Sequence, residues 1–149
     1  MKKTLAYLGI GELSSMLRSR EISPVELTAY YVNRISELNP QLNVFIEVAA
    51  ERAKAQAQAA EVLMDRGQFI GPLHGIPLAL KDLIDVKGLV TTGGSILRRT
   101  EIAQKNAYIV DRLVEAGAVM IGKTHMVEFA FGGTGVNHHY GTPWNPWDS

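Results

Sequence analysis

The stretch Ile76-Pro77-Leu78-Ala79-Leu80-Lys81-Asp82 is an apolar run that ends in two charged residues. Its length and composition predict a strand over Ile76–Lys81. A lysine at the end of such a strand has two interpretations. Its aliphatic stem can carry the ammonium group out to water, and this segment alone favours that interpretation. If the ammonium group is buried instead, it tends to release its proton, and the neutral amine can act as a general base.

Around this stretch, predicted helices alternate with short apolar segments. Ser23-Pro24-Val25-Glu26 is a capping box with proline at the first helical position, and the helix that it starts is expected to end at Asn39-Pro40. Further helices are predicted at Glu12–Arg20, at Glu47–Arg66 with Gly67 as the stop, and at Ala107–Ala116 closed by Gly117. Leu42–Val48 fits either a short strand or a loop, and Ala118–Ile121 indicates a buried strand. The pattern predicts an α/β fold with helices packed on a parallel or mixed sheet that is short of strands.

Composition narrows the class of protein. The chain has 149 residues, with 15 basic and 15 acidic side chains, so no net charge favours nucleic acid or an anionic membrane as a partner. Hydrophobic residues make up 46% of it, as in globular α/β proteins. It has no cysteine, which excludes a disulfide scaffold and a cysteine nucleophile. No apolar segment is long enough to cross a membrane, and we expect a cytoplasmic protein.

Two motifs suggest sites that the sequence context does not support. Gly117–Thr124 matches the phosphate-loop pattern G-x-x-x-x-G-K-[ST], but the predicted strand lies inside the motif rather than before it, which argues against a nucleotide site. The four histidines raise the question of a metal. Neighbouring His138 and His139 would point in different directions on extended backbone, without a carboxylate at ligand spacing, so we expect polar loop histidines and no metal.

Four ordered blocks of sequence carry a resemblance to a known family. They are Gly71–Asp82 (GPLHGIPLALKD), Val90–Ser95 (VTTGGS), Glu115–Gly132 (EAGAVMIGKTHMVEFAFG) and Tyr140–Trp147 (YGTPWNPW). In this order they resemble the amidase signature family, whose members hydrolyse amides with a Ser–cis-Ser–Lys triad. The resemblance implies that residues 1–149 are the N-terminal part of a single amidase signature domain, incomplete at the C-terminus.

The resemblance also implies a set of roles. Lys81 matches the catalytic base of the family, and both triad serines would follow Ser149, so we expect this chain alone to be inactive. Phe131, Gly132 and Gly133 match the segment that lines the acyl pocket and become candidate substrate contacts. Ser95 matches a loop serine rather than the nucleophile, and Asp82 is expected to fix its loop through backbone hydrogen bonds.

No cofactor is implied, and the implied partner is a small-molecule amide rather than nucleic acid or a membrane; a homodimer stays open. The stretch Val127–Phe131 departs from the Asp-Glu-Phe-Ala-Met form of the glutamine-dependent tRNA amidotransferase, which favours a general amidase. A non-catalytic remnant or binding module is the alternative of a different class.

Overall fold

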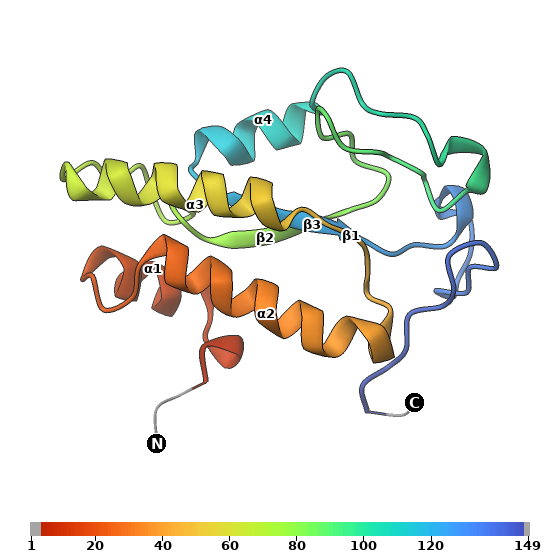
Figure 1. Cartoon of the computed structure of the whole chain (residues 1–149), viewed down its shortest axis with the longest axis horizontal. Coiled ribbons are helices and arrows are strands. Elements are labelled where there is room, and N and C mark those ends of the chain that lie inside the picture. Colours follow the sequence, from red (N-terminus) through yellow and green to blue (C-terminus); the bar gives the residue numbers. More distant parts are fainter. Residues whose placement is uncertain (1–3, 148–149) are drawn as a thin grey trace. The chain divides into compact units, whose positions relative to one another are not determined.

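The computed structural model describes residues 4–147 and has the α/β architecture that the sequence predicts (Figure 1). Its helices are α1 (Ile10–Arg18), α2 (Pro24–Leu42), α3 (Ala50–Asp65) and α4 (Tyr108–Glu115), and its strands are β1 (Phe45–Val48), β2 (Pro77–Lys81) and β3 (Val119–Thr124). Short 3-10 turns lie at Leu5–Tyr7, Ile96–Arg98 and Glu128–Ala130. The chain divides into two compact units: residues up to 34, 49–78 and 112–121 form the first, and residues 35–48, 79–111 and those from 122 onward form the second.

Helix α2 begins at the predicted capping box. The Ser23 hydroxyl accepts a hydrogen bond from the Glu26 N–H (3.1 Å), and the Glu26 carboxylate accepts one from the Ser23 N–H (2.9 Å). Each side chain thus satisfies a backbone donor that the first helical turn leaves without a partner. The cap signal in the sequence is confirmed.

The predicted end of α2 at Asn39-Pro40 is wrong, because the helix continues through Pro40 to Leu42. Proline removes a single N–H there, and the Asn43 N–H still donates to the Asn39 carbonyl oxygen (2.8 Å). The helix stops at Asn43, which adopts a left-handed conformation with φ of 48°. The Asn39 side chain then fixes the start of β1, since its Oδ1 accepts from the Phe45 N–H (2.7 Å) and its Nδ2 donates to the Phe45 carbonyl (3.0 Å).

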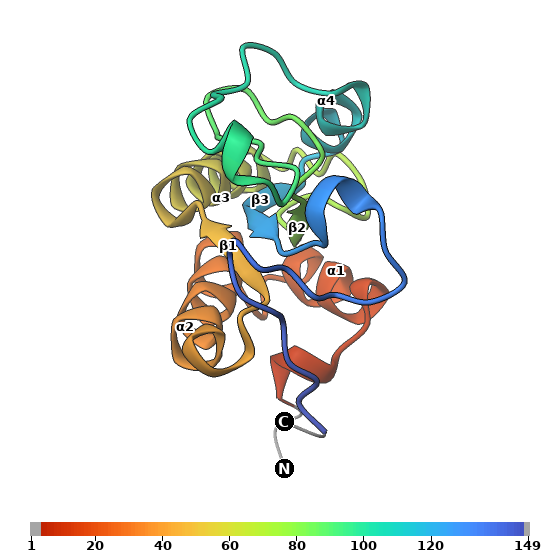
Figure 2. The same ribbon diagram turned by 90° about the vertical axis from the view of Figure 1, so that its right-hand side faces the viewer.

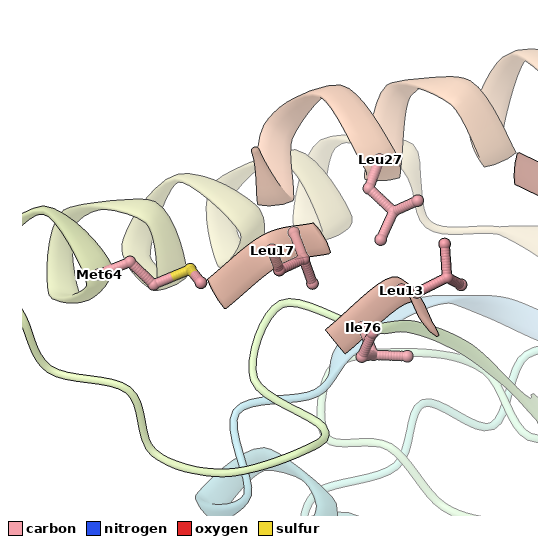
Figure 3. Packing of buried hydrophobic residues seen from close by; sticks show 5 residues of the cluster. All are labelled: Leu13, Leu17, Leu27, Met64 and Ile76. Carbon is pink, nitrogen blue, oxygen red and sulfur yellow. The ribbon is translucent and has the colours of Figure 1, made fainter. Parts of the chain in front are cut away.

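The core of the first unit packs α1, α2 and α3 around apolar side chains (Figure 3). The buried members of this cluster are Leu13, Leu17, Leu27, Met64 and Ile76. Leu13 and Leu17 are four residues apart and so lie on one face of α1. Helix α3 starts at Ala50, later than predicted, because Glu47 and Val48 belong to β1. It ends before Gly67, as predicted, with φ of 75° at that glycine.

The sheet has the strand order β1-β3-β2, and β1 runs antiparallel to β3. The Val119 N–H donates to the Ile76 carbonyl where β3 begins, and the Asp82 N–H donates to the Thr124 carbonyl where it ends. The two strands therefore run parallel, and the sheet is mixed. The segment Leu42–Val48, for which the sequence left strand or loop open, supplies the third strand, β1.

After β3 the chain turns back past the residues before β1 (Figure 2). The His125 N–H donates to the Val44 carbonyl (2.7 Å), and the Trp144 N–H donates to the Leu42 carbonyl (2.9 Å). These bonds, all within the second unit, hold the described part of the C-terminal segment in place. No helix of the described part of the chain is long and apolar enough to span a membrane.

Gly122 is required where β1 approaches β3. A Cβ atom at this position would lie 2.3 Å from the Glu47 carbonyl oxygen, a backbone atom that cannot rotate away. We expect Gly122→Ala to lower the free energy of unfolding by about 1–3 kcal/mol, measured by urea denaturation. Gly11→Ala is the matched control, because no atom lies within 4 Å of a Cβ there and α1 should gain about 0.5–1 kcal/mol. Equal unfolding midpoints for Gly122→Ala and the wild type would contradict this account.

His74 is fully buried, and its Nδ1 accepts a hydrogen bond from the Ile70 N–H (3.1 Å). Burial lowers the pKa of His74 below the ordinary value of 6.5, and a smaller effect of the Ala60 backbone acts in the opposite direction. Below pH 6.5 the His74 imidazole therefore binds a proton in the unfolded chain but not in the folded chain. The free energy of unfolding falls as the pH drops from 7 toward the lowered pKa. His74→Asn keeps an acceptor for Ile70 but does not titrate, so its free energy of unfolding should depend less on pH in this range. An unchanged pH dependence would count against the buried neutral imidazole.

Candidate active site

Lys81 is the last residue of β2, and its side chain is exposed in the described part of the chain. Asp82 follows at once and is 1% exposed. Successive side chains of an extended chain point to opposite faces, so the two neighbours meet different surroundings. Of the two interpretations that the sequence left for Lys81, the described residues show the exposed side chain rather than the buried one.

The carboxylate of Asp82 is held on both oxygens. Its Oδ1 lies 3.0 Å from the Lys123 ammonium nitrogen. Its Oδ2 accepts from the Thr92 N–H (3.2 Å) and from the Thr92 hydroxyl. Asp82 thus fixes the loop over residues 91–95 through a backbone hydrogen bond, as expected from the sequence, and it also forms an ion pair that the sequence did not indicate.

Among the lysines within residues 4–147, Lys123 is the buried one, with 0% of its side chain exposed. Its ammonium group has three donor protons and three acceptors: the Asp82 carboxylate (3.0 Å), the Thr91 hydroxyl (3.0 Å) and the Val90 carbonyl (3.3 Å). This is also the lysine of the phosphate-loop pattern. Because β3 occupies the inside of that motif and its lysine is enclosed, the pattern does not form a nucleotide site.

Sequence reasoning therefore missed Lys123 as a buried charge, although a signal was present. Lys123 follows the apolar run Ala118–Ile121, as Lys81 follows its own apolar run. Burying the ammonium group would be costly for either lysine. For Lys123, however, the phosphate-loop pattern predicts a phosphate ligand rather than a buried charge.

The loop over residues 91–95 is buried and joins two parts of the candidate site. The Gly93 N–H donates to the Asp82 carbonyl (3.0 Å), and the Gly93 carbonyl accepts from the Phe129 N–H (2.7 Å). The Thr92 hydroxyl also accepts from the Gly94 N–H (2.9 Å). A short series of hydrogen bonds thus runs from the residue after Lys81 to the segment that precedes Phe131.

The candidate substrate contacts Phe131, Gly132 and Gly133 lie on the surface, and Phe131 is 93% exposed. Among residues 4–147 no hydrogen bond or ion pair joins them to Lys81. Just before them, Phe129 and Ala130 have φ of 50° and 58°. Such conformations are strained for residues other than glycine and are common at functional sites.

Asn137 is a buried residue that sequence reasoning missed. Its Nδ2 donates to the Gly94 carbonyl (2.7 Å) and the Met126 carbonyl (2.9 Å). Its Oδ1 accepts from the N–H groups of His139 (2.8 Å) and Tyr140 (3.0 Å). One side chain thus ties the loop over residues 91–95 to the chain that follows β3. An asparagine in a polar loop carries no sequence signal for this role.

Ser95 and His139 each interact with another residue of the second unit. Ser95 is fully buried, and its hydroxyl accepts from the Leu97 N–H (3.3 Å) at the start of a 3-10 turn, which agrees with its rejection as a nucleophile. His139 lies 3.2 Å from the Glu128 carboxylate, a pair that is ionic only when the imidazole is protonated. The part of the chain that the structure covers contains no group of three or more His, Asp or Glu side chains that could hold a metal ion.

Comparison with known proteins places this chain in a family. The family model described as Amidase matches residues 26–149. One subunit of the glutamyl-tRNA(Gln) amidotransferase of Methylobacillus flagellatus is 48% identical over 137 residues, which are 92% of this chain and 28% of that protein. The 2-amino-5-chloromuconic acid deaminase of Comamonas testosteroni is 42% identical over 142 residues, which are 95% of this chain and 31% of that protein.

A solved structure agrees with the sequence relatives. The native peptide amidase from Stenotrophomonas maltophilia superposes with a TM-score of 0.88 at 33% identity, over 95% of this chain and 30% of the peptide amidase. The chain thus spans about three tenths of the length of the proteins that it matches. The matched family model, the identities and the shared fold together show that the chain belongs to the amidase signature family.

Proposed function

We propose that this chain supplies Lys81 as the general base of an amidase whose two triad serines come from residues beyond Ser149. The observation that carries the proposal is the position of Lys81 at the end of β2, next to a buried and fully hydrogen-bonded Asp82. Family membership supports amide hydrolysis as the reaction class. On this proposal residues 1–149 are the N-terminal part of a single amidase signature domain.

The proposed chemistry needs a neutral Lys81. A protonated lysine has no lone pair, so only the free amine can accept a proton. As the nucleophilic serine attacks the carboxamide carbon, its proton passes through the second serine to Lys81. The same proton then goes to the leaving amine when the carbon–nitrogen bond breaks, and water releases the acyl group. No step requires a cofactor.

The candidate pocket residues and the names of the relatives both bear on the substrate class. We propose that Phe131, Gly132 and Gly133 form one wall of the acyl pocket, since glycine lets a ligand approach the backbone closely. The relatives include a deaminase, a peptide amidase and one component of an amidotransferase, and these names all denote reactions at a carbon–nitrogen bond. A carboxamide is the substrate that this set supports best, either as a free small molecule or within an amidotransferase.

The role of Lys81 can be tested in the full-length enzyme that contains this segment. Lys81→Ala should lower kcat by about 10²–10⁴-fold with little change in KM, because it removes the base without removing a substrate contact. Lys81→Arg should not rescue turnover, since the guanidinium group stays charged. Lys105→Ala, on an exposed loop, is the matched control and should keep wild-type rates.

The 149-residue chain alone belongs in the same assay on simple amides. We expect no turnover from it, because it would lack both triad serines. Turnover by this short form would contradict the proposed position of the triad serines outside residues 1–149. A near-wild-type rate for Lys81→Arg would remove Lys81 from the proposed mechanism. Absence of activity in every form, with the fold intact, would favour the non-catalytic binding module.

A further inference from the structure

Asp82, the residue after Lys81, has hydrogen-bond partners for both its backbone and its side chain. The Asp82 N–H donates to the Thr124 carbonyl (3.1 Å), and its carbonyl accepts from the Gly93 N–H (3.0 Å). Its side chain meets the Lys123 ammonium group and the Thr92 N–H, at 3.0 and 3.2 Å. Backbone and side chain are therefore both fixed, by separate segments of the second unit.

We propose that Asp82 and Lys123 are positioning residues for the lysine base, which act by holding the peptide that follows Lys81. This inference rests on the proposed function of Lys81. Lys81 and Asp82 share one peptide bond, so a displacement of Asp82 moves the Cα atom of Lys81 and the direction of its side chain. Strand pairing with β3 holds Lys81 from the other side.

The charges of the pair support a positional role over a purely stabilising one. Removing two charges from water is costly, and apolar residues of similar size often give equal or greater stability at such positions. Charge-assisted hydrogen bonds are short and directional, whereas apolar contacts tolerate small shifts. Each proton of the Lys123 ammonium group has an acceptor, so the direction of this side chain is fixed by Thr91 and Val90 as well as by Asp82.

The size of the expected effect follows from general base geometry. A displacement of about 1 Å at a reacting group can cost about 10²-fold in rate without any change in the groups present. Thr91 supports the arrangement indirectly, because its hydroxyl accepts from Lys123. Its loss should have a smaller effect than loss of either charge.

The test compares charge variants in the full-length enzyme by steady-state kinetics and thermal unfolding. Lys123→Met leaves Asp82 as a lone buried charge and should lower both stability and kcat. The double variant Asp82→Asn with Lys123→Met removes both charges at once and keeps an oxygen for Thr92. It should recover most of the lost stability while kcat stays about 10²-fold below wild type and KM changes little.

Two further variants make the result decisive. Leu17→Ala removes a core side chain of the first unit and lowers stability, but kcat per folded molecule should match the wild type. Thr91→Val removes only one hydroxyl, so it keeps the test possible if the single charge variants do not fold. It should lower kcat by a smaller factor than the double variant.

Recovery of kcat together with stability in the double variant would overturn the inference, as would a wild-type kcat in Thr91→Val and the double variant alike. Lys81→Ala is run beside these variants to separate the two proposals. If Lys81→Ala is inactive while the pair variants keep the wild-type kcat, only the positional inference fails. If Lys81→Ala retains wild-type activity, the proposed function itself fails.

Discussion

The burial of the Lys123 ammonium group is the constraint on which the rest of the second unit depends. An ammonium group with no exposed surface needs an acceptor for each proton and an opposite charge beside it. Asp82, Thr91 and Val90 supply these, and they lie in two segments that are far from Lys123 in sequence. The requirement therefore draws the end of β2 and the loop over residues 91–95 together on β3.

Other features of the unit follow from that assembly. With the loop over residues 91–95 fixed, the Gly93 carbonyl can accept from Phe129, and the Asn137 side chain can bridge Gly94 and Met126. Gly94 has no room for a Cβ atom, because one would lie 2.9 Å from both the Asn137 amide nitrogen and the Met126 carbonyl oxygen. The glycine- and threonine-rich loop is thus a packed connector rather than a flexible turn, and it links the proposed base to the proposed pocket wall.

Local signals in the sequence predicted local structure well. The capping box before α2 and the glycine after α3 acted as expected, because their effect depends only on the nearest turn. The helix end predicted at Asn39-Pro40 was wrong, because a proline in the last turn costs one hydrogen bond and does not stop the helix. The sequence left strand or loop undecided for β1. Its half-buried pattern indicates a strand only when it is paired with β3, which comes much later in the chain.

The candidate site was predictable only in part for the same reason. Lys81 became a candidate through its motif, whereas the Asp82–Lys123 pair and the Asn137 bridge join residues that no short window of sequence contains. A charged residue after an apolar run predicts a buried ion pair only when the oppositely charged partner residue is also known. The roles proposed for Lys81 and for Phe131–Gly133 likewise rest on the family resemblance rather than on contacts among the described residues.

Amide hydrogen exchange tests most directly whether the buried pair holds the peptide after Lys81. The Thr92 and Gly93 N–H groups both donate to Asp82, whereas the Gly88 N–H donates to Ala103 in the same unit and serves as an internal reference. In Lys123→Met the account predicts that exchange at Thr92 and Gly93 accelerates at least about tenfold more than at Gly88, as expected for local rather than global opening. Equal acceleration at the three amides, or unchanged protection at Thr92 and Gly93, would contradict it.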